Sequence, residues 1–239
     1  MTRDEARAKI IFALDVNEFS DVEKWADLLS PHVGMFKVGK QLYTACGPAV
    51  VRMIQKYGGE VFLDLKYHDI PNTVAMASLE AARMGVKLFN LHALGGYEMM
   101  AKTVETLDKE FKGEERGKVL AVTILTSSNE QTLQEVGINL PVPEMVVKLA
   151  SLAKKAGIDG VVASPQEVPL IREACGNDFL IVTPGVRPAF AAADDQKRIM
   201  TPAEAVKSGA DYLVIGRPIA AAPNPAEAAQ AIVAEIVAG

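Results

Sequence analysis

The sequence predicts an α/β fold, a (β/α)8 TIM barrel that forms a single domain over residues 1–239. Short apolar runs rich in β-branched residues alternate with longer amphipathic stretches along the whole chain, as in parallel sheets covered by helices. Eight such runs are present, enough to close a parallel barrel. The 239 residues are close to the ~250 typical of this barrel, and no linker or shift in composition marks a second domain.

The expected elements follow one another regularly along the chain. The eight expected strands are residues 9–16, 34–39, 61–67, 86–93, 118–125, 157–164, 179–186 and 211–217. Helical segments between and after the strands open with Ser, Asn or Thr, as N-capped helices do, at residues 20–30, 72–85, 201–210 and 224–239. One long irregular segment, residues 185–202, follows the seventh strand, and a loop of this length is often a lid or else a surface insertion.

Composition and charge limit the classes of function. A net charge of -5 argues against nucleic acid or an anionic membrane as a partner, although a local basic site for a small anion stays possible. The N-terminus is charged and lacks the apolar stretch of a signal peptide, and no apolar run reaches the ~18 residues of a membrane span. Two cysteines, Cys46 and Cys175, stand far apart in no CxxC pattern, so we expect a reduced, cytoplasmic protein.

Four charged residues lie on the first three expected strands. Asp15 ends the first, Lys37 lies in the second, and Asp64 and Lys66 end the third, where residues two apart share a face. Chemistry in a barrel is carried by the C-terminal ends of the strands. Buried charges are tolerated when they are paired, so these four could form a structural ion-pair network. Their clustering at one end of three neighbouring strands favours a functional site.

A second cluster follows the seventh and eighth strands. The segments TPGVR and GRP supply glycines, backbone N–H groups and the guanidinium groups of Arg187 and Arg217. Barrels often bind phosphate at this place, and arginine donates two parallel hydrogen bonds to phosphate oxygens. The sequence therefore predicts a phosphorylated ligand. It contains no P-loop, GxGxxG or HExxH motif, and its three histidines have no metal-ligand spacing.

These residues resemble the orotidine 5′-phosphate decarboxylase family along almost the whole chain. The resemblance runs through FALDV, FKVG, FLDLKYHDIPNTV, HALGG, VTILTS, TPGVRP and GRPI. It implies decarboxylation of orotidine 5′-phosphate to UMP, the last step of de novo pyrimidine synthesis, with no cofactor and no metal. It also implies a homodimer, in which the partner subunit contributes Asp69 and Thr73 to the site.

The resemblance also assigns roles to individual residues. Its catalytic array of alternating charges falls on Lys37, Asp64, Lys66 and Asp69, with Lys66 protonating C6 of the pyrimidine. A local reading of Asp69 is that it helps to start the helix after Pro71. The substrate-binding residues implied are Asp15 at the ribose, Lys37 and Asp64 in the array, Ile70 and Thr73 beside Asp69, Thr126 and Ser127 around the pyrimidine, and Arg187, Gln196, Gly216 and Arg217 at the phosphate.

Three other functions fit parts of the pattern. A magnesium-dependent sugar-phosphate decarboxylase or hexulose-phosphate synthase shares the DxKxxD element, but it has a metal-binding acid where this chain has Lys37. A Schiff-base aldolase would need Lys66 neutral, whereas Asp64 and Asp69 favour its charged form. A barrel that only binds nucleotides has no need of four coupled charges.

Overall fold

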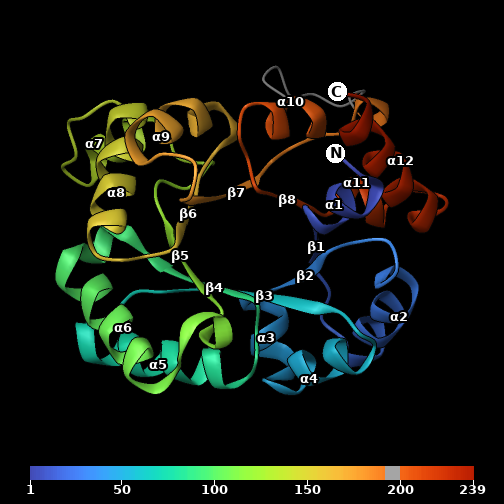
Figure 1. Cartoon of the computed structure of the whole chain (residues 1–239), viewed down its shortest axis with the longest axis horizontal. Coiled ribbons are helices and arrows are strands. Elements are labelled where there is room, and N and C mark those ends of the chain that lie inside the picture. The colour runs from blue at the N-terminus through green and yellow to red at the C-terminus, as the bar shows by residue number, and fades with distance from the viewer. Residues whose placement is uncertain (192–199) are drawn as a thin grey trace. The chain divides into compact units, whose positions relative to one another are not determined.

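The structure, a computed structural model, describes residues 1–191 and 200–239, without the side chains of residues 113 and 114. Eight parallel strands follow one another in chain order in a closed barrel, so the predicted (β/α)8 fold is confirmed (Figure 1). The strands are β1 (Ile10–Leu14), β2 (Met35–Gly39), β3 (Glu60–Tyr67), β4 (Leu88–His92), β5 (Lys118–Val122), β6 (Gly160–Val162), β7 (Leu180–Pro184) and β8 (Tyr212–Ile215). Every expected strand is present, although most are shorter than predicted, since several of the residues at their ends are irregular or begin a helix.

Helices occupy most of the connections between the strands. The α-helices are α1 (Arg3–Ala8), α2 (Phe19–Leu29), α3 (Lys40–Cys46), α4 (Ala49–Lys56), α5 (Pro71–Arg83), α6 (Gly96–Glu110), α7 (Glu130–Glu135), α8 (Val142–Lys155), α9 (Val168–Cys175), α10 (Pro202–Lys207), α11 (Arg217–Ala220) and α12 (Pro225–Ala238). Short 3-10 helices are η1 (Ala93–Gly95), η2 (Gly113–Arg116), η3 (Pro165–Glu167) and η4 (Ala189–Ala191). No helix within the described residues is long and apolar enough to cross a membrane.

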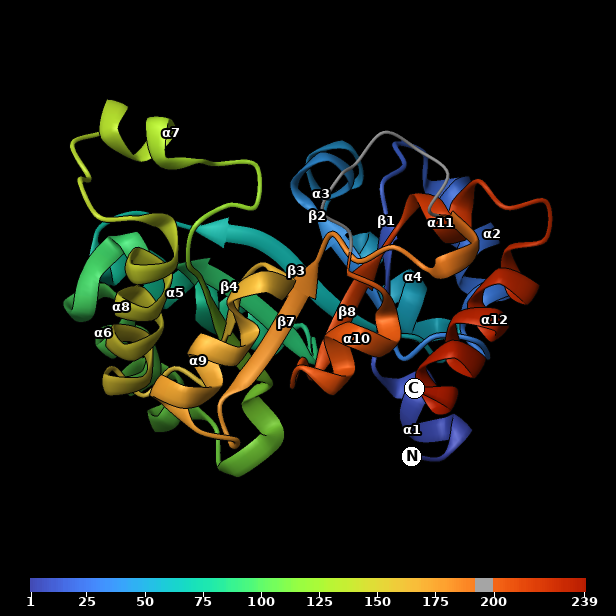
Figure 2. The ribbon, with the colours of Figure 1, turned by 90° about the horizontal axis from the view of Figure 1, so that it is seen from above.

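The chain divides into two compact units, of which the first combines both ends of the sequence, Met1–Leu65 and Gly185–Gly239. In this unit β1 lies between β2 and β8, and β3 pairs with β2. All five residues of β1 are buried, and three of the five in β2 are buried, as expected for parallel strands covered by helices. The Phe12 ring packs against Phe36 and Trp25, with ring centroids 6.2 and 5.3 Å apart. Helix α12 lies beside α1, near both chain ends (Figure 2).

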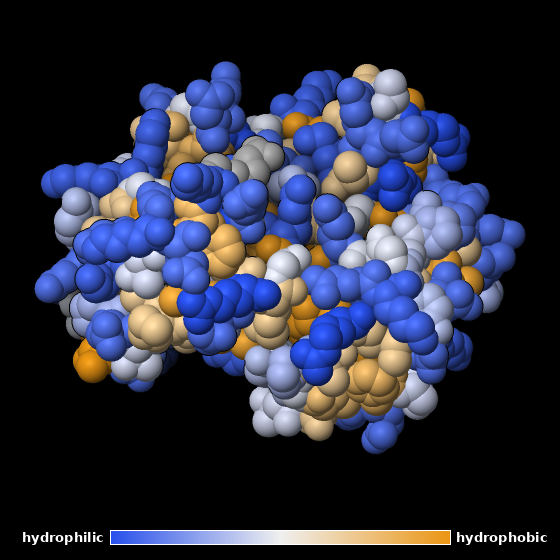
Figure 3. Space-filling model, turned by 60° about the horizontal axis from the view of Figure 1, so that its bottom comes forward, coloured by the Kyte–Doolittle hydropathy of each residue, from blue (hydrophilic) through white to orange (hydrophobic). Residues whose placement is uncertain are grey.

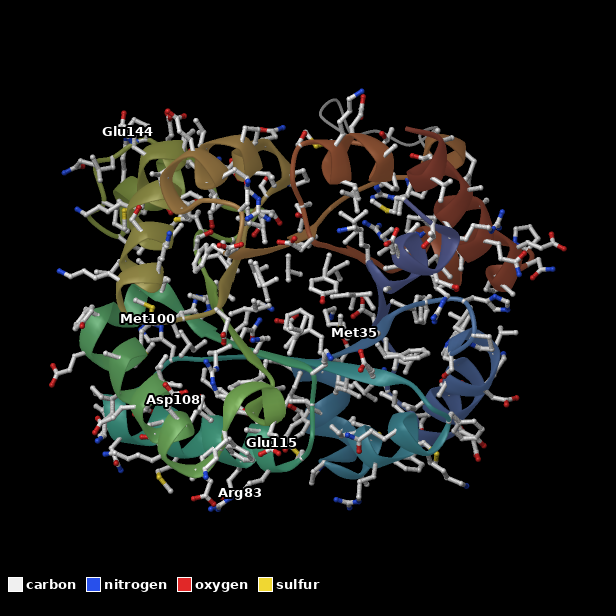
Figure 4. The ribbon with its side chains drawn as sticks, viewed as in Figure 1. Met35, Arg83, Met100, Asp108, Glu115 and Glu144 are labelled. Carbon is white, nitrogen blue, oxygen red and sulfur yellow. The ribbon has the colours of Figure 1, made fainter. Side chains whose placement is uncertain are left out.

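The second unit, Lys66–Pro184, is continuous in sequence. Its strands pair in the order β4, β5, β6 and β7. Helices α5 and α6 pack together, and Arg83 of α5 joins them at the outer edge of the unit by an ion pair with Glu110 of α6 at 2.7 Å (Figure 4). Arg83 also forms an ion pair with Glu80 of its own helix at 2.9 Å. Helix α7 stands away from α8 at the end of the connection that follows β5 (Figure 2).

The predicted helix starts are correct at two places and wrong at two others. Thr201 caps α10 in a reciprocal capping box with Glu204, and Asn224 accepts a hydrogen bond from the N–H of Glu227 at the start of α12. Helix α2 instead begins after Glu18 and α5 begins after Ile70, and neither residue forms a side-chain cap. Pro71 at the first position of α5 explains this second start, because its fixed backbone angle suits a helix and it has no N–H to satisfy.

Candidate active site

In the first unit, Lys37 lies between two carboxylates. Residues 13 and 37 are register partners on β1 and β2, and Gly39 is the partner of Asp64 on β3. The Lys37 Nζ atom is 3.4 Å from Asp15 Oδ1 and 3.7 Å from Asp64 Oδ2. A Cβ atom on residue 39 would stand 3.0 Å from that Nζ, so the glycine leaves room for the ammonium group. The structure thus brings together three of the predicted charges.

The two contacts of Lys37 differ in their exposure to water. The side chains of Lys37 and Asp64 are only 14% and 11% exposed, whereas that of Asp15 is 68% exposed. Solvent screening makes the contact with Asp15 weak, while the shielded pair of Lys37 and Asp64 interacts more strongly. Asp15 is therefore the member of this cluster that is open to a ligand.

Replacing Lys37 with methionine is expected to lower the free energy of unfolding by about 1–3 kcal/mol, because the shielded Asp64 carboxylate loses a cationic partner. Adding Asp64→Asn in the same chain should recover part of this loss, since the buried charge is then absent. Lys40→Met, at an exposed position of α3, is the matched control and should change stability by less than about 0.5 kcal/mol. Urea titrations of the four proteins measure these differences, and equal stability of the two lysine variants would contradict the pairing.

The end of β8 and the segment after β7 carry the predicted phosphate ligands in the same unit. A Cβ atom on residue 216 would lie 3.2 Å from Ala13 Cβ and 3.6 Å from Asp15 Oδ2, so Gly216 lets the chain pass close to the end of β1. Arg217 follows at the first position of α11 and is exposed. The backbone N–H of Arg187 donates to the Met200 carbonyl at 3.1 Å, which closes the base of the connection between them.

Gln196, the remaining predicted phosphate ligand, lies outside the described residues, as do residues 192–199 of the long segment 185–202 as a whole. The described part of the connection begins with η4 and ends where α10 starts. The backbone N–H of Ala189 donates to the carboxylate of Glu235 on α12 at 3.2 Å. The start of this connection is therefore tied to the C-terminal helix.

In the second unit, Lys66 has an unusual backbone conformation. Its φ of 53° lies in the left-handed region, and no other described residue except glycine has a positive φ. Such a conformation costs a non-glycine residue roughly 1–2 kcal/mol, so the surrounding structure must hold it. The backbone N–H of Lys66 donates to the Oδ1 atom of Asn90 at 2.8 Å. Because the strand geometry is interrupted here, alternation along β3 does not establish the predicted shared face of Asp64 and Lys66.

Sequence reasoning missed Asn90 as part of this region. Asn90 is fully buried in β4, between Phe89 and Leu91. A polar residue in the middle of an apolar strand could have indicated a structural or functional contact, because buried amide groups require hydrogen-bond partners. The signal does not name the partner, and the left-handed conformation of Lys66 is invisible in the sequence.

The predicted residues at the start of α5 are all exposed. Asp69 Oδ1 accepts a hydrogen bond from the N–H of Ile70 at 2.7 Å, and Ile70 itself is the N-cap residue of the helix. The Asp69 side chain therefore bonds to the N-cap residue directly before the helix. Thr73 lies in the first turn, and the Ile70 side chain is 67% exposed.

The remaining predicted residues, Thr126 and Ser127, lie in a turn after β5. The N–H of Ser128 donates to the Leu125 carbonyl at 2.8 Å and closes this turn. Both predicted residues are exposed, so their hydroxyl groups are accessible to a ligand. Within residues 1–191 and 200–239, no group of three or more His, Cys, Asp or Glu side chains is arranged to hold a metal ion.

Comparison with known proteins identifies the family of the chain. Residues 8–232 match the orotidine 5′-phosphate decarboxylase / HUMPS family. The chain is 89% identical over 238 residues to the orotidine 5′-phosphate decarboxylase of Geotalea uraniireducens, covering 100% of this chain and 99% of that protein. It is 79% identical to the protein of the same name from Geobacter sulfurreducens, over 100% of both chains.

A solved structure agrees with the sequence relatives. The crystal structure of orotidine 5′-phosphate decarboxylase from Lactobacillus acidophilus has a TM-score of 0.83 and 39% sequence identity to this chain. The match covers 95% of this chain and 98% of that one. The similarity therefore extends over essentially the whole barrel, and the chain belongs to the orotidine 5′-phosphate decarboxylase / HUMPS family.

Proposed function

We propose that this protein converts orotidine 5′-phosphate to UMP and CO₂ without a cofactor. Family membership over residues 8–232 and relatives named for this activity support the reaction. The structural observation that carries the proposal is the Lys37 ammonium group, held 3.4 and 3.7 Å from the carboxylates of Asp15 and Asp64. Fixed charges of this kind suit a reaction whose main difficulty is the charge that develops in the transition state.

In the proposed reaction the bond between C6 of the pyrimidine and its carboxylate carbon breaks. CO₂ leaves, and the electron pair stays on C6 until Lys66 donates a proton to it. A cation beside C6 stabilises this developing negative charge. Asp64 lies at the departing carboxylate, and its repulsion of that group favours departure. Lys37 and Asp69 hold the neighbouring Asp64 and Lys66 in position by charge attraction.

The rest of the substrate binds through groups distant from the reacting carbon. Asp15, which is open to solvent, accepts hydrogen bonds from the ribose hydroxyls. Thr126 and Ser127 contact the pyrimidine, and Ile70 and Thr73 lie beside Asp69. The phosphate binds to Arg187, Gln196, Arg217 and the backbone at Gly216. Binding energy from the phosphate lowers the barrier when it is used to hold the pyrimidine in its reactive position.

The alternative within the same family is a magnesium-dependent enzyme acting on a sugar phosphate. Lys37 argues against it, because an ammonium group 3.7 Å from Asp64 repels a divalent cation at that carboxylate. The decisive experiment mixes the purified protein with orotidine 5′-phosphate and follows the ultraviolet absorbance of the orotate ring, with and without EDTA. Rapid loss that EDTA does not change is expected. Loss abolished by EDTA would favour the metal-dependent alternative, and no loss in folded protein would contradict the proposal.

We also propose that the active enzyme is a homodimer in which Asp69 and Thr73 reach the partner's site. Apolar side chains are exposed at the N-cap of α5 and on α5, η1 and α6, namely Ile70 at 67%, Met76 and Leu94 at 45%, and Tyr97 at 46%. Exposed apolar residues that gather on neighbouring elements are typical of interaction surfaces. Space-filling Figure 3 shows one face of the molecule, where apolar residues in orange lie among hydrophilic residues in blue.

Mixing two inactive variants tests the shared site. Lys66→Ala and Asp69→Ala homodimers should each be inactive, and unfolding and refolding them together should restore activity to about a quarter of the wild-type value, since half of the dimers then hold one intact site of two. The refolded single variants are the controls. An inactive mixture that contains mixed dimers, verified by differently tagged chains, would contradict a site built from two subunits.

We further propose a cytoplasmic location and a single cooperative domain. The two cysteines, Cys46 and Cys175, are free thiols, which is usual in a reducing compartment. The family match extends across both compact units, which supports one domain over residues 1–239. Coincident unfolding transitions followed by circular dichroism and tryptophan fluorescence would support one cooperative domain, and two separate transitions would contradict it.

A further inference from the structure

The backbone conformation of Lys66 is unusual, and the proposed role of its side chain as a proton donor does not explain it. Lys66 lies within strand β3, yet its φ of 53° is in the left-handed region. This conformation is intrinsically unfavourable for lysine, because its Cβ atom lies too close to the backbone. Glycine has no Cβ atom and would avoid this steric conflict. A strained conformation persists when neighbouring groups hold it in place, and it is found mainly at functional sites.

The strained backbone at residue 66 forms a hydrogen bond with the side chain of Asn90. Its Oδ1 atom accepts the N–H of Lys66 at 2.8 Å, within the range of a good hydrogen bond. In a parallel sheet, the N–H of a strand residue normally donates to a backbone carbonyl group of the neighbouring strand. The N–H of Lys66 instead donates to a side-chain oxygen. Asn90 is fully buried on β4, so water does not compete for this contact. A buried side chain with few available rotamers holds its oxygen in a fixed position.

Asn90 is a buried polar residue in a strand whose other buried residues are apolar. The other residues of β4 are Leu88, Phe89, Leu91 and His92, and the first three of these are buried and apolar. Leucine has the same number of non-hydrogen side-chain atoms as asparagine and the same branching at Cγ, and β4 already contains leucine at residues 88 and 91. Packing alone would therefore favour leucine at residue 90. Burying an amide group is costly unless it forms hydrogen bonds, and the N–H of Lys66 provides one.

We propose that Asn90 is a positioning residue for Lys66. Its amide oxygen fixes the left-handed backbone at residue 66 and thereby the direction in which the lysine side chain leaves the strand. This inference rests on the proposed function, in which Lys66 protonates C6. If the hydrogen bond is lost, the backbone at residue 66 relaxes toward the ordinary strand region, and the ammonium group moves away from the reacting carbon.

The test compares Asn90→Leu with a matched control, Thr103→Val. Thr103 is also fully buried in the same unit, and its hydroxyl group donates to the Met99 carbonyl at 2.9 Å. Each variant thus removes a buried side-chain-to-backbone hydrogen bond, but only the first of these bonds involves Lys66. Asn90→Leu is expected to lower kcat about 100-fold, the scale of an error of about 1 Å in a catalytic group. The affinity for UMP should change by less than about threefold, because the phosphate and ribose contacts stay intact.

Thr103→Val should lose stability without a change in kcat per folded molecule. Asn90→Asp, which keeps an oxygen acceptor, should retain most of the activity that Asn90→Leu loses. Equal kcat values for Asn90→Leu and wild type would overturn the proposal, and so would equal kcat losses in Asn90→Leu and Thr103→Val. In a Lys66→Ala background, Asn90→Leu should cause no further loss of turnover, and an additional loss would show that Asn90 does not act through Lys66.

Two measurements keep this proposal separate from the proposed function. Hydrogen exchange of the Lys66 amide in the wild-type protein should be strongly slowed, and exchange as fast as in an exposed loop would overturn the proposal even if no variant folds. A crystal structure of Asn90→Leu should show the φ of residue 66 outside the left-handed region. If both results are as expected but the protein does not decarboxylate orotidine 5′-phosphate, the proposed function fails while the structural role of Asn90 stands.

Discussion

Replacing Lys66 with alanine is expected to lower kcat for decarboxylation of orotidine 5′-phosphate by about 10⁴-fold or more. Two effects of the ammonium group are lost together. General acid catalysis contributes roughly 10²–10⁴ in rate, and a preorganised charge beside the developing carbanion contributes roughly another 10²–10³. Steady-state kinetics with absorbance detection measure the loss, and the variant should still bind UMP because the proposed phosphate ligands are other residues.

A second lysine variant controls for charge and for folding. Lys102 lies on α6 in the same unit, where it forms an exposed ion pair with Glu105 at 3.2 Å. Lys102→Ala also removes one ammonium group, but it should retain wild-type kcat. Circular dichroism should show that both variants are folded. A Lys66→Ala protein that keeps more than about a tenth of wild-type turnover would refute the proposed proton donor, since each of the two effects alone exceeds that factor.

Replacing Arg217 with alanine should weaken UMP binding by about 10–100-fold while leaving the affinity for uridine unchanged. A hydrogen bond to a charged group is worth about 1.5–3 kcal/mol, and arginine can form two of them with one phosphate. Uridine lacks the phosphate, so comparing the two ligands isolates this contact from general damage to the site. Isothermal titration calorimetry gives both affinities. The added variant Arg187→Ala should reduce UMP binding further.

The control for this prediction is Arg52→Ala, an exposed residue of α4 in the same unit. It changes the net charge by the same amount and should leave the affinity for UMP within about twofold, as expected for an exposed charge that does not contact the ligand. If Arg217→Ala weakens uridine and UMP equally, the arginine acts on the shape of the site and not on the phosphate. If neither affinity changes, the phosphate site lies elsewhere.

The barrel was predictable because each strand can be recognised from its own residues. Residues buried on both faces produce continuous apolar runs, and eight of these with helical segments between them leave few other topologies. The cluster of Asp15, Lys37 and Asp64 was predictable for a related reason. In a parallel barrel consecutive strands are neighbours, so charges near the ends of the first three strands come close together.

Other features depend on contacts that no local pattern encodes. The left-handed backbone of Lys66 follows from its contact with Asn90, 24 positions later in the sequence. The start of α5 was misplaced because Asn72 resembles a cap, whereas Pro71 already occupies the first turn. Local rules describe residues through their sequence neighbours, and these two positions are decided by a distant side chain and by the fixed ring of proline.

The division of the first unit between the two ends of the chain has a consequence for protein synthesis. The Lys9 ammonium group donates to the Asp211 carbonyl, 202 positions away, and the neighbouring strands β1 and β8 pair directly. During translation β1 is therefore synthesised early, but one of its edges stays unpaired until β8, near the end of the polypeptide, has been synthesised. In the continuous second unit, β4, β5, β6 and β7 pair with one another in chain order, so these pairings can form before β8 is translated. Nascent chains stalled before β8 should accordingly present an unpaired apolar strand to chaperones.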